Sequence, residues 1–381
     1  MLVEIHMIQN HAPSNLNRDD TGSPKDCLFG EIPRARISSQ CIKRSIRRSP
    51  VFQTEMKDIP MGMRTRLLPA LVKDELLARG VAADIAEIAA KKATGFGTKE
   101  GTERDEINTA QIMFLSPDDV KLVTDVLHDA IKKSKTKEAF AKVEASALQK
   151  EAGKRGWTPI TPDIALFGRM TTSAAFLDIQ ASMQVAHAIS TNKVDNKFDY
   201  FTAVDDKKGQ VGDTDDLGAG MIGDVEFNSA CYYKYFTLDT DGFVANIVPP
   251  DATKDQLASG KDVLKKTVRA FFKAAVFTTP SGKQNTFAAH QLPDAILVEV
   301  RAQKTPVSYA NAFVEPARPH DGKSLVTDSI EKLASHADLL RKKFSLECAA
   351  RLWFTTTDVA LAGAQVCDTV DDLLNTLDTT L

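Results

Sequence analysis

Alternating apolar and polar residues predict strands near both ends of the chain. Residues 2–9 (LVEIHMIQ) show this period-two pattern over the length of one strand. Residues 226–239 (EFNSACYYKYFTLD) are rich in the aromatic side chains that favour sheets. The apolar segments 295–302 and 344–354 predict two more strands. Strand-forming segments therefore flank the middle of the chain, where the pattern changes.

Four other segments carry the spacing of amphipathic helices. Two of them, 63–94 and 117–152, are rich in Ala, Leu, Lys and Glu and predict a helical subdomain. The segments 172–190 and 264–277 predict two further helices. Because the first two segments interrupt the strands early and as one block, the pattern favours an α+β fold with one long insertion.

Two polar segments predict loops. The first, 10–26, follows the first strand and is rich in Asn, Asp, Pro, Ser and Gly. The second, 205–224, is rich in Gly and Asp, and a loop of that length in a compact protein is usually functional or disordered. After the first loop, Ser38 or Ser39 is a suitable N-cap for a short helix with Ile42 and Ile46 on one face.

Charge is unevenly distributed along the 381 residues. The formal net charge is −3, which excludes a uniformly basic nucleic-acid coat but not a local basic groove. Residues 34–49 (RARISSQCIKRSIRRS) contain six basic side chains and no acidic one. They are Arg34, Arg36, Lys43, Arg44, Arg47 and Arg48.

The basic segment has two readings. A run of charge is commonly a solvated helix face. Alternatively, Lys43 and Arg47 share one face of the helix, and the free N–H groups at its start form an anion site. With Arg18 and Lys25 in the preceding loop, they could hold a phosphodiester backbone. Composition alone leaves the two readings about equal.

Known catalytic motifs do not match. The segments GFGTK (95–99) and PSGKQN (280–285) lack the spacing of a phosphate-binding loop, and neither GxSxG nor HExxH occurs. Asp19 and Asp20 are adjacent carboxylates that could bind Mg²⁺ in a nuclease, although a turn or an ion pair is the commoner role. Five scattered cysteines and no apolar run of about 18 residues indicate a cytoplasmic protein with reduced thiols.

Several blocks resemble one known family. Residues 11–47 (HAPSNLNRDDTGSPKDCLFGEIPRARISSQCIKRSIR) are similar to the N-terminal signature of the backbone subunit of type I-E CRISPR Cascade, the CasC family. Similar blocks follow in the family's order: ALFGRMTTSAAF (165–176), QVAHAISTNKVDNKFDYFTAVDD (184–206), GDVEFNSACYYKY (223–235), GKQNTFAAHQLPDAILVEV (282–300) and SYANAF (308–313). The resemblance covers nearly the whole chain, apart from about 55–155.

The resemblance implies a fold in three parts. A palm built on an RRM-like (ferredoxin-like) sheet would comprise residues 1–54 and 156–381. A large helical insertion, the fingers, would comprise 55–155. A β-hairpin thumb would span about 201–226 and have its tip in the loop 205–224.

It also implies a set of RNA contacts. Met170 in GRMTTS matches an apolar wedge beside a displaced base, although a methionine by itself is more often core packing. Phe201 and Thr202 would open the thumb, and Leu217 and Met221 are the apolar residues near its tip. The residues that match the family's contacts to the RNA backbone are Arg18, Lys25, Ser38, Gln40, Lys43 and Arg47.

The implied function is structural. Such a subunit polymerises along a CRISPR guide RNA, kinks it at regular intervals and displays the bases for pairing with target DNA in antiviral defence. Its partners would be further copies of itself and the large, small, guide 5′-end and guide 3′-end binding subunits of Cascade, with no membrane and no cofactor. It would not be an enzyme, because a recruited nuclease carries out the cleavage of the target. Two alternatives stay open: a metal-dependent ribonuclease using Asp19 or Asp20, and a single-strand RNA binder that works alone.

Overall fold

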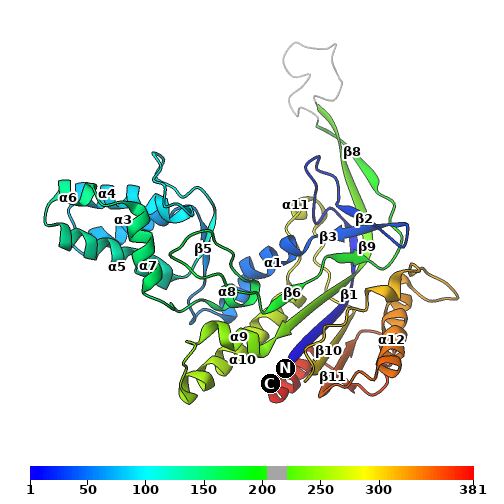
Figure 1. The fold of residues 1–381 in the computed structure, drawn as a ribbon. Helices are drawn as coiled ribbons and strands as arrows, with labels where there is room; N and C mark the ends of the chain where they lie inside the picture. The colour runs from blue at the N-terminus through cyan, green and yellow to red at the C-terminus, as the bar shows by residue number, and fades with distance from the viewer. Residues whose placement is uncertain (204–220) are drawn as a thin grey trace, which may run out of the picture. The chain divides into compact units, whose positions relative to one another are not determined.

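The structure, a computed structural model, describes residues 1–203 and 221–381, and its chain divides into two compact units (Figure 1). The first unit contains Met1–Phe52, Val185–Thr237 and Phe271–Leu381, and the second contains Gln53–Gln184 and Leu238–Ala270. The helices predicted within 63–94 and 117–152 all lie in the second unit. The limits predicted for palm and fingers stay a prediction.

A large sheet forms the centre of the first unit. Its strands run in the order β12-β11-β10-β1-β9-β7-β3-β2, and the pairs β1–β10, β10–β11, β7–β9, β3–β7 and β2–β3 are antiparallel. The α+β fold class predicted from the sequence is confirmed. The strands are β1 (Leu2–Ser14), β2 (Asp26–Phe29), β3 (Ile32–Ile37), β7 (Ala188–Ser190), β9 (Met221–Asp239), β10 (Ala295–Arg301), β11 (Ala350–Thr355) and β12 (Gln365–Val366).

The second half of β9 is buried on both faces, because helices pack on both sides of the sheet there. Alternate residues of a strand point to opposite faces. Tyr233 joins a core with Ile330 of α12 (Leu325–Phe344). Phe236 contacts Phe271, near the end of α10 (Lys254–Phe277), with ring centroids 5.3 Å apart. The first unit also contains α1 (Ser39–Arg48), α11 (Gln284–Phe287), η2 (Ala310–Phe313) and α13 (Val370–Thr380), and α2 (Pro50–Glu55) begins in it.

A buried ionic cluster joins three neighbouring strands. Arg301 on β10 lies 3.0 Å from Glu4 on β1 and also pairs with Glu299. Arg351 on β11 donates from Nε to Glu299 at 2.9 Å. Because removing one partner of a buried ion pair leaves an uncompensated charge, the cluster favours a single register for β1, β10 and β11.

The second unit is built round a helical core. Leu76, Phe96, Leu127 and Phe140 are among the side chains that are fully or almost fully buried there. Its elements include β4 (Met63–Thr65), α3 (Leu68–Ala78), α4 (Ala83–Thr94), η1 (Gly95–Gly97), β5 (Met113–Leu115), α5 (Pro117–Ser134), α6 (Lys137–Ala141), α7 (Ala145–Lys154), α8 (Pro162–Phe167) and α9 (Thr240–Ile247). Among the described helices of the whole chain, none is long and apolar enough to cross a membrane.

The prediction of a helix over residues 172–190 is wrong. The chain there is irregular and then forms the short strands β6 (Met183–Val185) and β7. Arg169 and Ile179 form an isolated bridge, and Asp178 accepts a hydrogen bond from the Thr171 amide at 2.7 Å. These contacts, and the pairing of β7 with β3 and β9, therefore override the helical spacing.

Other predicted limits shift by several residues. The first strand continues from residue 9 to Ser14, which shortens the loop predicted for 10–26. The strand predicted for 344–354 begins only at Ala350, because α12 extends to Phe344 and ends in the left-handed residue Ser345. The N-cap prediction is confirmed at Ser38, whose side chain accepts from the Cys41 amide at 3.3 Å.

One of the six basic side chains of residues 34–49 belongs to the core. The side chain of Arg34 is fully buried, and its guanidinium donates to the carbonyls of Ser190, Thr191, Phe313 and Val314 at 2.7–3.2 Å. Four backbone acceptors from two distant segments thus depend on one cation.

We expect Arg34→Ala to lower the free energy of unfolding by about 3 kcal/mol, because it leaves several buried carbonyls unpaired. Chemical denaturation of the purified chain measures this. The matched control is Arg48→Ala, at an exposed position, which should change the value by no more than about 0.5 kcal/mol. Equal stability of the two variants would contradict the structural role of Arg34.

Candidate functional site

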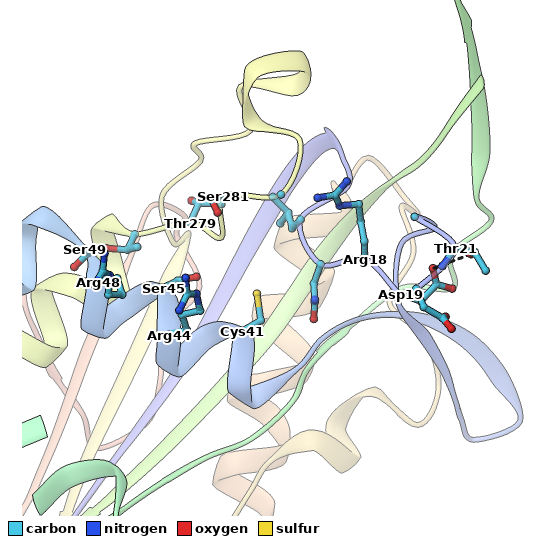
Figure 2. A pocket seen from close by; sticks show the side chains of 16 residues that line it. Arg18, Asp19, Thr21, Cys41, Arg44, Ser45, Arg48, Ser49, Thr279 and Ser281 are labelled. Carbon is cyan, nitrogen blue, oxygen red and sulfur yellow. Dashed lines mark hydrogen bonds between the residues drawn. The ribbon is translucent and has the colours of Figure 1, made fainter. Parts of the chain in front are cut away.

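One face of α1 lines a polar groove of about 750 Å³ in the first unit (Figure 2). Its residues on that groove are Cys41, Arg44, Ser45 and Arg48, which follow the i, i+3, i+4, i+7 spacing of one helix face. Both arginines are exposed to solvent. The helix is fixed by its buried residues Ile42 and Ile46, so these cations are held on the side facing the groove.

The loop after β1 forms a second wall. Residues 16–22 line the groove, and Arg18 among them is exposed. The side-chain oxygen of Asn17 accepts from the Ser38 amide at 2.8 Å, which ties this loop to the start of α1. Arg18 therefore lies across the groove from the cations of the helix (Figure 2).

The segment that follows α10 contributes hydroxyl groups. Thr278, Thr279 and Ser281 line the groove together with Gly282. A Cβ atom at Gly282 would collide with the carbonyl oxygens of Asn15 and Leu16. This close approach explains the glycine in the PSGKQN segment, which packs against the loop after β1.

The two acidic residues of the groove have different roles. Asp19 is a turn residue: its Oδ1 accepts from the Thr21 amide and hydroxyl and from the Ser23 amide, at 2.8–2.9 Å. The hydrogen bond from Thr21 holds the pKa of the Asp19 carboxyl below its usual range. Asp20 beside it is exposed. Among the residues that the structure describes, no three or more His, Cys, Asp or Glu side chains form a group that could hold a metal ion.

The arrangement suits a polyanion. Three arginines and several hydroxyls surround an open groove, and guanidinium groups bind phosphate oxygens in forked, charge-assisted hydrogen bonds. None of the four residues that α1 contributes is large and apolar. The groove can therefore hold a phosphodiester backbone without stacking on its bases.

The predicted contacts on α1 lie around this groove rather than in it. On a helix of 3.6 residues per turn, Lys43 and Arg47 flank the buried Ile42 face on the side opposite Cys41 and Ser45. Both are half-buried. Gln40 is exposed in the first turn, and Ser38 is buried as the N-cap.

Lys25 lies at the end of the loop after β1. It is half-buried, and its backbone amide donates to the Asn17 carbonyl at 2.8 Å. Of the six residues predicted to contact the RNA backbone, only Arg18 lines the groove.

Sequence reasoning placed Arg44 and Arg48 in the basic segment but did not select them as site residues. Their i, i+4 spacing was visible, yet Lys43 and Arg47 have the same spacing. The hydroxyl residues of 278–282 were missed because they are distant in sequence. The one available signal was the Gly-Lys dipeptide of PSGKQN, and it pointed to a phosphate loop whose spacing does not match.

Met170 belongs to the second unit and is 94% exposed. Its neighbour Arg169 is buried and pairs with Asp119 at 2.6 Å, which fixes the backbone beneath the methionine. The methionine lines a small pocket of about 20 Å³ together with Phe114 and Phe176. Such an apolar side chain on a rigid base differs from ordinary core packing, and the predicted wedge role stays a prediction.

Phe201 and Thr202 lie in β8 (Lys197–Ala203), which pairs with Met221–Phe227 of β9 as a hairpin projecting from the sheet (Figure 1). Every residue of β8 is exposed. The ring of Phe201 covers Gly223, where a Cβ would come within 2.6 Å of it. Met221 is 58% exposed, whereas Leu217 and most of the predicted loop 205–224 lie outside the described residues.

Comparison with protein families gives a match over nearly the whole chain. The family described as CT1975-like protein matches residues 3–379. The chain belongs to this family. No curated protein matches it.

Two solved structures are similar to this chain over its whole length. A chain of a "CRISPR RNA-guided surveillance complex, pre-nicking" is 26% identical, with a TM-score of 0.81 over 100% of this chain and 99% of that one. A chain of a "CRISPR RNA-guided surveillance complex" is 21% identical, with a TM-score of 0.72 over 100% of both. The second likeness concerns the fold alone.

Proposed function

We propose that this protein is a guide-RNA-binding backbone subunit of a CRISPR surveillance complex of the Cascade type. The observation that carries the proposal is the groove of Arg18, Arg44 and Arg48 in a fold that matches a surveillance-complex chain from end to end. A guide changes its sequence from one complex to the next. Its carrier must therefore bind phosphates and leave the bases to pair with the target.

The finer proposal is a type I-E complex in the cytoplasm. Copies of the chain polymerise along the guide with the large, small and guide-end subunits, and the hairpin of one copy kinks the RNA so that target DNA can pair between the kinks. Phe201, Thr202 and Met170 support this part, since all three side chains are accessible. In this proposal the chain itself carries out no reaction.

We expect the double variant Arg44→Ala, Arg48→Ala to weaken binding of single-stranded RNA. Each arginine that neutralises one phosphate adds about 0.7 to the slope of log affinity against log salt, so the slope should fall by about 1.4. Fluorescence anisotropy over a salt series measures it. The control is the double variant Lys342→Ala, Lys343→Ala, which removes two exposed cations of α12. It should leave the slope unchanged.

The same titration with Lys43→Ala and Arg47→Ala tests the contacts predicted from family resemblance. If this variant loses RNA affinity and the Arg44, Arg48 variant does not, the RNA lies on the other flank of α1. That outcome would count against the groove. If the wild-type chain binds no RNA at all, the proposed function is wrong.

Met170→Ala should leave RNA loading unchanged but weaken capture of complementary DNA by the assembled complex, by about tenfold, because a base that is not displaced disturbs the pairing register. Leu177→Ala, another exposed apolar position of the second unit, is the matched control. DNA affinity equal to that of the wild type would remove the wedge role.

The alternative is a metal-dependent ribonuclease using Asp19 or Asp20. The turn hydrogen bonds of Asp19 favour a structural role for it, so Asp20 is the more informative position. Incubating the assembled protein with complementary RNA and Mg²⁺ should give no cleavage. Evenly spaced cuts that Asp20→Asn abolishes would instead establish the enzyme.

A further inference from the structure

A buried lysine lines a small niche next to the groove. Lys234 is 4% exposed, on the same face of β9 as Phe236. It lines a niche of about 10 Å³, together with Ser45 of α1 and Thr278. Both of these residues also line the groove. The niche that Lys234 lines and the groove therefore share two hydroxyl residues.

The surroundings of Lys234 supply no counter-ion. The other residues of the niche are apolar: Ile37, Ile42, Ile46, Phe236, Ala275 and Pro280. Within residues 1–203 and 221–381, no hydrogen bond or ion pair joins its side chain to another residue. The small part of its surface that stays exposed lets water solvate the ammonium in place of a charged partner.

One titratable group interacts electrostatically with this lysine from a neighbouring strand. His11 on β1 is buried, and burial lowers its pKa to about 4, with a further contribution from Lys234 itself. It is therefore neutral above about pH 5. The elements that pack on Lys234 from α1, β3 and α10 contribute no acidic or basic side chain to the niche.

We propose that Lys234 is a further anion-binding residue of this site, holding a positive charge beneath the phosphate group that lies over Ser45 and Thr278. The proposal rests on the proposed function, since it needs a phosphate in the groove. The niche has the volume of about one water molecule, and Lys234 and two hydroxyl residues are among the residues that line it. The lysine can therefore act through its field or through one bridging water, without entering the groove.

Phosphate binding and protonation of Lys234 must then be linked. Burial lowers the pKa of Lys234 to about 8, so near neutral pH most molecules carry the charge. A phosphate nearby favours the charged form, and by reciprocity the charged form favours the phosphate. The contribution of Lys234 to RNA affinity is fully present below this pKa. It is lost as the pH rises above the pKa that Lys234 has in the RNA-bound form.

The test compares Lys234→Met with the wild type in binding a fluorescent single-stranded RNA. Methionine keeps the length and removes the charge. We expect about a tenfold loss of affinity near pH 7. Between about pH 6.5 and about pH 9 the wild-type affinity should fall about fivefold more than that of the variant. Lys342→Met, at an exposed position of α12, should retain the wild-type pH profile.

Thermal unfolding separates this role from a structural one. Since burial disfavours the charged lysine, Lys234→Met should melt at the same temperature as the wild type or higher near pH 7. Equal RNA affinity and an equal pH profile in the variant would overturn the inference while leaving RNA binding intact. Weaker binding with an unchanged pH profile would also overturn it, because the lysine would then act only through packing.

Discussion

The packing of α1 against the sheet is the constraint on which the groove depends. Ile42 and Ile46 are buried in a ten-residue helix, and each contributes about 2 kcal/mol by leaving water. Their position decides which side chains of the helix face the groove. The Ser38 cap and the hydrogen bond from its amide to Asn17 then fix where the helix begins and where the facing loop runs. The cations are thus positioned by apolar contacts and backbone hydrogen bonds.

The basic side chains of this region have different environments although the sequence presents most of them as one run. Arg34 supports the backbone of two distant segments from inside the core, whereas Arg44 and Arg48 are exposed to the groove. Lys234 is buried without a counter-ion and comes from another part of the chain. Net charge alone conceals this division, because a protein of net charge −3 can have a positive potential in one groove.

Local patterns predicted much of the fold. The alternation of residues 2–9, the cap at Ser38 and the amphipathic pattern near 264–277 rest on neighbours in sequence, and each has its counterpart in β1, α1 and α10. The prediction of a helix over 172–190 is wrong, because the spacing of apolar residues does not encode the pairing of Arg169 with Ile179. The same limit applies to the groove. The packing of α1 on the sheet decides which flank of the helix faces the loop. The groove wall formed by residues within 278–282 comes from a segment distant in sequence.

The register of α1 also constrains how this chain can change by insertion or deletion. Each residue of an α-helix turns the chain by 100°, so one residue added between Ser38 and Ile42 cannot keep both the cap and the apolar contact in place. If the isoleucines kept their packing, the cap would be displaced from the loop bearing Arg18. If the cap held, Ile42 and Ile46 would rotate by 100° away from the core, and the hydroxyl residue Ser45 would take the place of Ile46. Length variation is therefore far more costly in this short helix than in surface loops, and natural variants should differ there by substitution alone.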